Sequence, residues 1–221
     1  MDNRGKKIVY MSQCILNQNL RFPGIAIESG VISKLLTPIV ENGIGIESLP
    51  CLERLGWGGV QRQIFFKYLP KITDNLEKKS FPIIKLFLRI WLRNYKKLCR
   101  KEAKKLAIQI QDYYKSGYSI LGIITTNDSP TCGITKTINL LDLSSKFKDL
   151  SLKKEIFENP RLEKMKNLIP NLCVNGVGLF TSELIKQFKK YKLDIKIIGL
   201  DIWKDITEET KKILDKLDLR I

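Results

Sequence analysis

Residues 119–125, Ser-Ile-Leu-Gly-Ile-Ile-Thr, form a continuous apolar run of the kind that is buried on both faces in a parallel sheet. Three further runs have a similar strand-like character, Lys6–Ser12, Gly43–Leu49 and Asp194–Leu200. Residues from about 27 to 41 have a helical pattern, and a strand–helix–strand unit of this kind is right-handed in nearly all folds. The sequence therefore predicts an α/β fold, with a mainly parallel, open, Rossmann-like sheet of about four to five strands flanked by helices.

Three of the five cysteines follow predicted strands. Cys14 comes after the first strand, Cys51 after the second and Cys132 after the apolar run at 119–125. The carboxyl ends of parallel strands lie along one edge of a sheet, which is where open α/β folds build their sites. If the three strands are neighbours, three thiolates converge on one point. That arrangement is typical of a metal or cluster site with one coordination position left for substrate.

The 221 residues are expected to form one α/β domain, residues 1–221, with a basic helical insertion at about 62–116. Within the insertion, Ser80–Ser116 is predicted as one long helix. On a helical wheel its apolar side comprises Ile84, Phe87, Leu88, Trp91, Tyr95, Leu98 and Leu106. Its basic side comprises Lys85, Arg89, Arg93, Lys96, Lys97, Arg100 and Lys104.

Shorter helices are expected elsewhere in the second half of the chain. Helical turns are predicted near residues 145–168, and a glycine turn at Asn175 opens a helix that runs to about Lys192. A short amphipathic helix at Thr207–Leu217 is expected to be peripheral.

The formal net charge is +16, and the segment 81–116 supplies half of it, +8. One interpretation is the solvated face of an amphipathic helix that packs on the sheet. The other is a docking surface, the basic face Lys85–Lys105, for an RNA backbone or an anionic membrane. No run approaches the roughly 20 apolar residues of a membrane span, and no secretory signal is expected at the N-terminus, so a cytoplasmic protein is predicted.

The chain has no histidine, which excludes Ser-His-Asp triads, Cys-His proteases and His-ligated zinc. In a reducing compartment, five cysteines are more often buried, metal-binding or catalytic than paired in disulfides. Cys99 falls beside the apolar side of the long helix and is expected to be a packing residue. Cys173 precedes a glycine turn; it is either a fourth ligand or resolving thiol, or a packing residue at a strand end.

Three thiolates admit two inorganic centres. They cannot saturate a [4Fe–4S] cluster, which takes four ligands, and the shortfall leaves one iron open as a Lewis acid for a sulfur or oxygen atom of a substrate. They also suit zinc with water in the fourth position. The spacing of the cysteines does not decide between the two.

Three local motifs add to this reading: Ser12-Gln13-Cys14 followed by Arg21-Phe22-Pro23-Gly24, then Pro50-Cys51-Leu52-Glu53 followed by Gly58-Gly59, then Ser129-Pro130-Thr131-Cys132-Gly133. In their order and approximate distances they resemble the thiouracil desulfidase (TudS-like) family, over about residues 6–60, 117–137 and 174–200. The chain departs from the family's pattern at Asn17, Pro23 and Leu52, where the family has Gly, Asp and Pro. It resembles a divergent member.

The resemblance implies a [4Fe–4S] cluster held by Cys14, Cys51 and Cys132, which takes sulfur from a small thiolated base and releases it as hydrosulfide. It also implies that Glu53 is the acid/base and that Ser129 orients the substrate. The alternatives are an ion pair of Glu53 with Arg54 or Arg62, and a turn-capping role for Ser129. Other functions in view are a non-catalytic iron–sulfur or zinc sensor that docks on nucleic acid, and an α/β binding protein with reduced core thiols.

Overall fold

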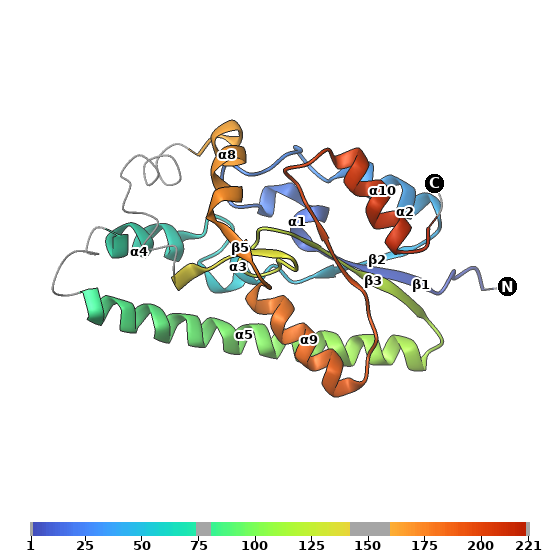
Figure 1. Cartoon of the computed structure of the whole chain (residues 1–221). Coiled ribbons are helices and arrows are strands. Elements are labelled where there is room, and N and C mark those ends of the chain that lie inside the picture. The colour runs from blue at the N-terminus through green and yellow to red at the C-terminus, as the bar shows by residue number, and fades with distance from the viewer. Residues whose placement is uncertain (1, 74–80, 142–159, 220–221) are drawn as a thin grey trace.

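The computed structural model describes residues 2–73, 81–141 and 160–219. At its centre is a parallel sheet with the strand order β2-β1-β3-β6 (Figure 1). Its strands are β1 (Lys7–Ser12), β2 (Gly45–Leu49), β3 (Ser119–Thr126) and β6 (Ile197–Leu200). A small antiparallel pair is formed by β4 (Lys136–Ile138) and β5 (Cys173–Asn175). The prediction of an α/β fold with a parallel sheet is confirmed.

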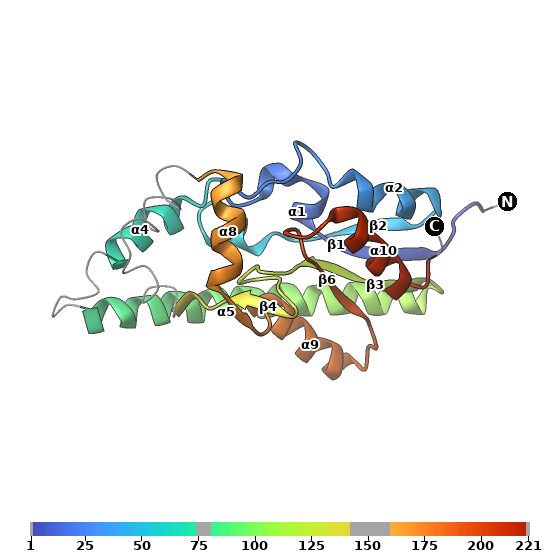
Figure 2. The same cartoon turned by 45° about the horizontal axis from the view of Figure 1, so that its top comes forward.

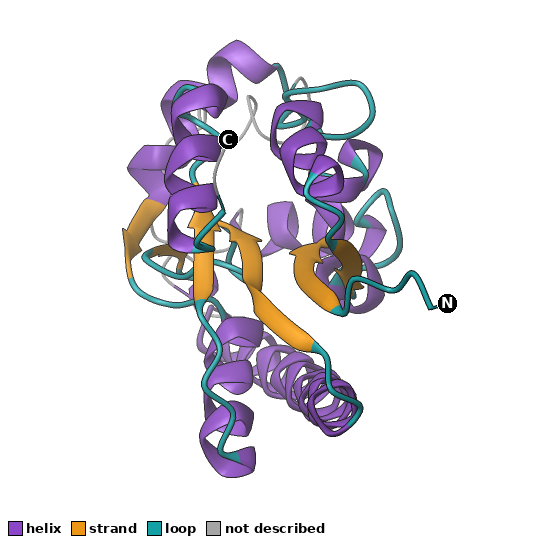
Figure 3. Ribbon diagram, turned by 90° about the vertical axis from the view of Figure 1, so that its right-hand side faces the viewer, coloured by secondary structure: helices purple, strands orange, loops and turns teal. Residues whose placement is uncertain are grey.

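Helices cover both faces of the sheet, which gives three layers (Figure 3). One layer consists of α2 (Ser33–Glu41) and α10 (Ile206–Lys216), and the other of α5 (Phe81–Lys115) and α9 (Leu179–Tyr191). Side chains alternate along β1: Val9 and Met11 join the core under α2 and α10, whereas Tyr10 joins the core on the α5 side. The alternation follows from the two-residue period of a strand. It gives each helical layer its own apolar core.

Short helices gather beyond the carboxyl ends of the strands. They are α1 (Gln13–Leu16), the 3₁₀ helix η1 (Gln18–Leu20), α3 (Leu52–Gly56), α4 (Gln63–Thr73) and α8 (Leu162–Leu172). Figure 2 shows α4 and the first half of α5 reaching away from the sheet, on the side opposite the N-terminus. None of the described helices combines the length and apolar character that crossing a bilayer requires.

The long basic helix is present as α5, and most of its apolar side packs as expected. Leu88, Tyr95 and Leu106 are buried, and so is Cys99, which confirms its packing role. Phe87 differs from the prediction, because 67% of its surface is exposed. It lies in the first half of α5, which extends beyond the sheet (Figure 2).

The remaining elements differ from the predictions mainly at their ends. The helix expected from residue 27 begins at Ser33, and the helix expected from Asn175 begins at Leu179. The turns expected near 145–168 fall largely outside the described residues, which resume before α8. The helix at 206–216 is not peripheral: Ile213 and Leu214 are each 1% exposed and belong to the core that it shares with α2. Its amphipathic pattern indicated a buried stripe, and the stripe completes a layer.

A buried carboxylate fastens α9 to α5. The side chain of Glu183 is 1% exposed, and it pairs with Lys186 at 2.8 Å, Arg100 at 3.1 Å and Lys96 at 4.0 Å. Burial alone would raise the pKa of Glu183, but the hydrogen bonds and charges of Lys186 and Arg100 outweigh it and lower that pKa. Two of the basic residues on α5 therefore serve the fold.

Replacing Glu183 with Gln should lower the free energy of unfolding by about 1–3 kcal/mol at neutral pH, because a charged acceptor of hydrogen bonds is lost. A carboxylate whose pKa is lowered by folding stabilises the fold above its unfolded pKa, and that contribution disappears as pH falls through the folded pKa. Urea unfolding at pH near 7 and near 3 should show the wild-type and Glu183→Gln curves converging in acid. Glu102→Gln, which removes the surface pair with Lys105, is the control and should change stability by about 0.5 kcal/mol or less.

Candidate functional site

The three strand-following cysteines come together at the carboxyl end of the sheet. Cys14 lies in α1, directly after β1; Cys51 is the residue before α3, after β2; and Cys132 lies in the loop after β3. All three line one pocket of about 110 Å³. Since the chain leaves β1 toward β2 and later returns to β3 on the other side, the pocket sits at the switch point of the sheet. The three strands are neighbours and their cysteines share one pocket lining, whereas a metal or cluster site among them stays a prediction.

The pocket has apolar walls and a polar end. Its walls include Leu20, Phe22, Ile25, Trp57, Phe65 and Leu172, and its polar end includes Gln13, Arg21, Glu53, Arg62, Asp128 and Ser129. A volume of 110 Å³ is below the range for sites that enclose drug-sized ligands. The pocket is therefore small.

The pocket raises the pKa of two of its thiols, Cys51 and Cys132. Burial raises the pKa of Cys132 well above its usual range, and Cys14, Glu53 and Cys51 raise it further. Burial also raises the pKa of Cys51, with Glu53 and Cys14 contributing. A cation beside these two sulfurs would oppose the effect and favour their thiolate forms. Yet nowhere in the described ranges do three Cys, Asp or Glu side chains converge tightly enough to hold a single metal ion.

Backbone and side-chain contacts fix the loops that carry these thiols. Gln13 accepts a hydrogen bond from the backbone N–H of Cys51 at 3.2 Å, which joins the first two loops. Thr181 of α9 donates to the carbonyl of Cys132 at 2.9 Å. A Cβ on Gly133 would collide with the carbonyl of Lys136, so the turn after Cys132 requires glycine. The third loop is held from α9 and by its own tight turn.

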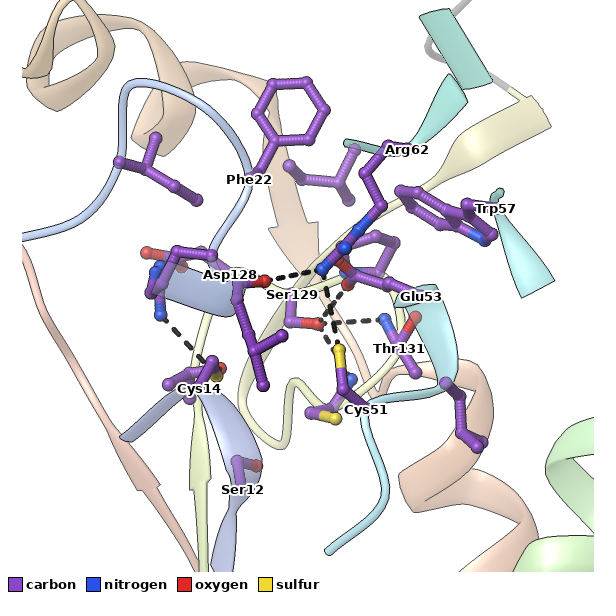
Figure 4. Close-up of a pocket in the computed structure, with 18 of the residues that line it drawn as sticks. Ser12, Cys14, Phe22, Cys51, Glu53, Trp57, Arg62, Asp128, Ser129 and Thr131 are labelled. Carbon is purple, nitrogen blue, oxygen red and sulfur yellow. Dashed lines mark hydrogen bonds and ion pairs between the residues drawn. The ribbon is translucent and has the colours of Figure 1, made fainter. Parts of the chain in front are cut away.

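Glu53 and Ser129 meet in this pocket, although 76 residues separate them in the chain. Ser129 Oγ donates to Glu53 Oε1 at 3.0 Å and accepts from the backbone N–H groups of Thr131 at 3.1 Å and Cys132 at 2.9 Å. Ser129 therefore caps the turn before Cys132, as one alternative held, and also orients the carboxylate of Glu53. Figure 4 shows Ser129 and Glu53 facing the same space as the sulfur of Cys51.

Arg62 is a site residue that the sequence indicated only as a possible ion-pair partner. Its side chain is 1% exposed, and its Nε lies 3.9 Å from Glu53 Oε2. Its Nη2 donates toward Cys51 Sγ at 3.5 Å and to the carbonyl of Leu20 at 2.6 Å. The glycine pair before it, with φ of 94° at Gly58 and 80° at Gly59, turns the chain back over the pocket. The glycine pair indicated a turn in the sequence but did not indicate that Arg62 is buried.

A second arginine reaches another of the thiols. Arg21 Nη1 donates toward Cys14 Sγ at 3.9 Å, and Thr126 Oγ1 lies 3.9 Å from the same sulfur. Arg21 Nε is buried without a hydrogen-bond partner in the described part of the chain. Two guanidinium groups therefore approach the cysteine sulfurs from the polar end of the pocket.

Asp128 is a further lining residue that the sequence did not single out. It is buried, and its backbone adopts a φ of 67°, in the left-handed region that few side chains other than Asn and Asp tolerate. Burial raises the pKa of its carboxyl, and the charge of Asp201 adds to the effect. Its position directly before Ser129 was the only hint in the sequence.

The other two cysteines lie outside the pocket lining. Cys99 is buried in α5, where burial raises its pKa to about 12. Cys173 begins β5, and its Sγ donates to the carbonyl of Ile169 at 3.2 Å. Of the two interpretations of Cys173, a strand-end packing residue is the one that this geometry favours.

Comparison with known proteins finds a distant archaeal relative. A protein of Methanocaldococcus jannaschii described as uncharacterized is 26% identical over 163 residues, which covers 73% of this chain and 90% of the relative. No family model matches the sequence, and no solved structure matches it. The site therefore has to be interpreted from its own chemistry.

Proposed function

We propose that the protein is an iron–sulfur-dependent desulfidase that removes sulfur from a small thiolated nucleobase or a related thioamide. One observation carries the proposal: thiols from three separate loops line the same pocket as a hydrogen-bonded Glu53–Ser129 pair. The three motifs that resemble the thiouracil desulfidase family all lie at this pocket. Reduced thiols of this kind also fit a cytoplasmic setting.

The donor set fits a [4Fe–4S] cluster better than zinc. A single zinc ion needs its sulfur ligands about 2.3 Å from one point, and no group in the described residues is that compact. In a cluster each thiolate binds a different iron, so the thiolates stand farther apart. Cys14, Cys51 and Cys132 would hold the cluster, and the fourth iron would have no protein ligand. Two guanidinium groups at the sulfurs supply donors that suit an anionic cofactor.

When bound, the cluster would supply a Lewis-acidic iron that accepts the substrate's sulfur atom. The net reaction is hydrolytic: the C=S bond is replaced by C=O from water, hydrosulfide and a proton leave, and no oxidant or reductant is consumed. Glu53 is the group that takes a proton from the attacking water, and Ser129 holds its Oε1 in position. The apolar walls at Phe22 and Trp57 favour a flat, weakly polar ring beside this carboxylate.

Metal analysis tests the cofactor. Protein purified without oxygen should be brown, with broad visible absorbance and about four irons per chain. Cys14→Ser, Cys51→Ser and Cys132→Ser should each lose most of this iron. Cys99→Ser and Cys173→Ser are the matched controls and should keep it, since neither residue lines the pocket. A colourless wild-type protein, or iron loss confined to the controls, would contradict the cluster.

Glu53→Gln tests the chemistry. Gln keeps the size of the side chain and an acceptor for Ser129 but cannot take a proton. Iron content should be unchanged, while hydrosulfide release from 2- or 4-thiouracil should fall by about 10²–10⁴-fold, the usual contribution of a general acid/base. A variant with wild-type turnover would remove Glu53 from the mechanism. A wild-type protein that carries the cluster and releases no hydrosulfide from any thiolated base would favour the sensor alternative.

The basic face of α5 extends the proposal to a polynucleotide partner. Lys85, Arg89, Arg93 and Lys97 recur at four-residue intervals and are all exposed. Within the described residues, no ion pair engages these four, whereas Lys96 and Arg100 pair with Glu183. We propose that this row contacts an RNA backbone.

Fluorescence anisotropy with a single-stranded RNA across salt concentration tests this contact. Affinity should fall as salt rises, because phosphate contacts release counterions. Replacing the four row residues with Gln should reduce the slope of log K against log salt by about three. The control is a variant that loses the same number of charges elsewhere, with Gln at Lys189, Lys190, Lys211 and Lys216. Salt-independent binding, or binding only to anionic vesicles, would contradict an RNA contact.

A further inference from the structure

The guanidinium of Arg62 is the most deeply buried charge that lines the pocket, at 1% side-chain exposure. Much of it is held by the protein's own backbone: Nη1 donates to the carbonyls of Gly59 and Val60, both at 2.9 Å, and Nη2 donates to the carbonyl of Leu20. Neutral carbonyls fix the position of a cation without cancelling its charge. The side chain is therefore rigid and still positive.

One edge of this guanidinium remains unsatisfied. Nε is buried and has no hydrogen-bond partner in the described residues; Glu53 Oε2, at 3.9 Å, lies beyond hydrogen-bonding distance. On the same edge, Nη2 lies 3.5 Å from Cys51 Sγ. A buried cation whose N–H lacks a hydrogen-bond partner is costly even with Glu53 as its ion-pair partner, and such groups are generally retained where they meet a ligand. Figure 4 shows Arg62 reaching from the Trp57 side toward Cys51 and Glu53.

The chemistry of this edge defines what it can bind. A charged N–H donor with fixed geometry prefers an anionic acceptor, and sulfur is a large, soft acceptor that tolerates the longer distance seen to Cys51. Glu53 lies on the same edge, so a proton acceptor and a cationic hydrogen-bond donor lie side by side. A neutral thiocarbonyl gains little from this donor, whereas an anionic sulfur gains much.

We propose that Arg62 is the anion-binding residue of the pocket: it fixes the Cys51 thiolate and receives the sulfur of the substrate as that atom becomes anionic. This inference rests on the proposed function for the identity of the anion. It assigns to Arg62 a role separate from those of the three cysteines, Glu53 and Ser129. It also explains why an arginine is buried at this point in the chain.

The test uses sodium hydrosulfide as the probe, added without oxygen to iron-loaded protein and followed by visible circular dichroism. Arg62→Gln should weaken hydrosulfide binding by about 10- to 100-fold, the factor that corresponds to losing one charge-assisted hydrogen bond. Arg62→Lys keeps the positive charge but lacks the planar guanidinium, so its hydrosulfide affinity should lie between those of the wild type and Arg62→Gln. Arg161→Gln, the same change at an exposed residue that does not line the pocket, should bind as the wild type does.

A second readout does not depend on turnover or on hydrosulfide. Removing a nearby positive charge should shift the reduction potential of the cluster to a more negative value in Arg62→Gln and leave it unchanged in Arg161→Gln. A purely structural role would lower iron content or thermal stability without changing the potential of the cluster that remains.

The outcomes separate the two proposals. Wild-type hydrosulfide affinity in iron-loaded Arg62→Gln overturns the role of Arg62 and leaves the desulfidase proposal standing. If Arg62→Gln does not load iron, the Arg62→Lys variant is used instead. Wild-type hydrosulfide affinity in Arg62→Lys overturns the role of Arg62, and so does failure of Arg62→Lys to load iron. Absence of iron from the wild-type protein overturns the proposed function itself, and this is determined before any variant is compared.

Discussion

The position of β1 between β2 and β3 is the constraint on which the site depends. The register places Ser12 of β1 beside Leu49 of β2 and Met11 beside Ile124 of β3. The three strands therefore end close to one another, and the residues that follow them lie along one edge of the sheet. This pairing brings the three cysteines to one edge, because each cysteine lies within a few residues of the end of its strand.

Around that edge the protein places buried polar groups with roles beyond packing. Ser129 uses one hydroxyl both to cap a turn and to hold Glu53, and Arg62 carries a buried charge with an unsatisfied N–H. Such groups are rare in the interior of a protein unless they serve a site. The α5–α9 interface shows the contrast, since its buried carboxylate, Glu183, is surrounded by three cations.

Much of this could be predicted from the sequence. The strands were evident from uninterrupted apolar runs such as 119–125, and the convergence of the cysteines followed from strand ends alone. Helix beginnings were less certain, since α2 starts at Ser33 without a side-chain cap that would mark it. Arg62 could not be identified as buried, because an arginine after a glycine pair is usually solvated and only the tertiary fold covers it. The exposure of Phe87 was also not predictable, since a helical wheel does not show where the sheet ends.

The spacing of the three thiols along the chain has a consequence for biogenesis. Cys14 and Cys132 lie more than a hundred positions apart, with α5 between them. In an unfolded chain, joining such distant points through one inorganic group would cost loop-closure entropy, whereas the folded sheet already holds the three loops together. An iron–sulfur centre in this protein would accordingly be inserted into the folded chain. Loss of the centre to oxygen would leave a folded protein that can be reconstituted with a new one.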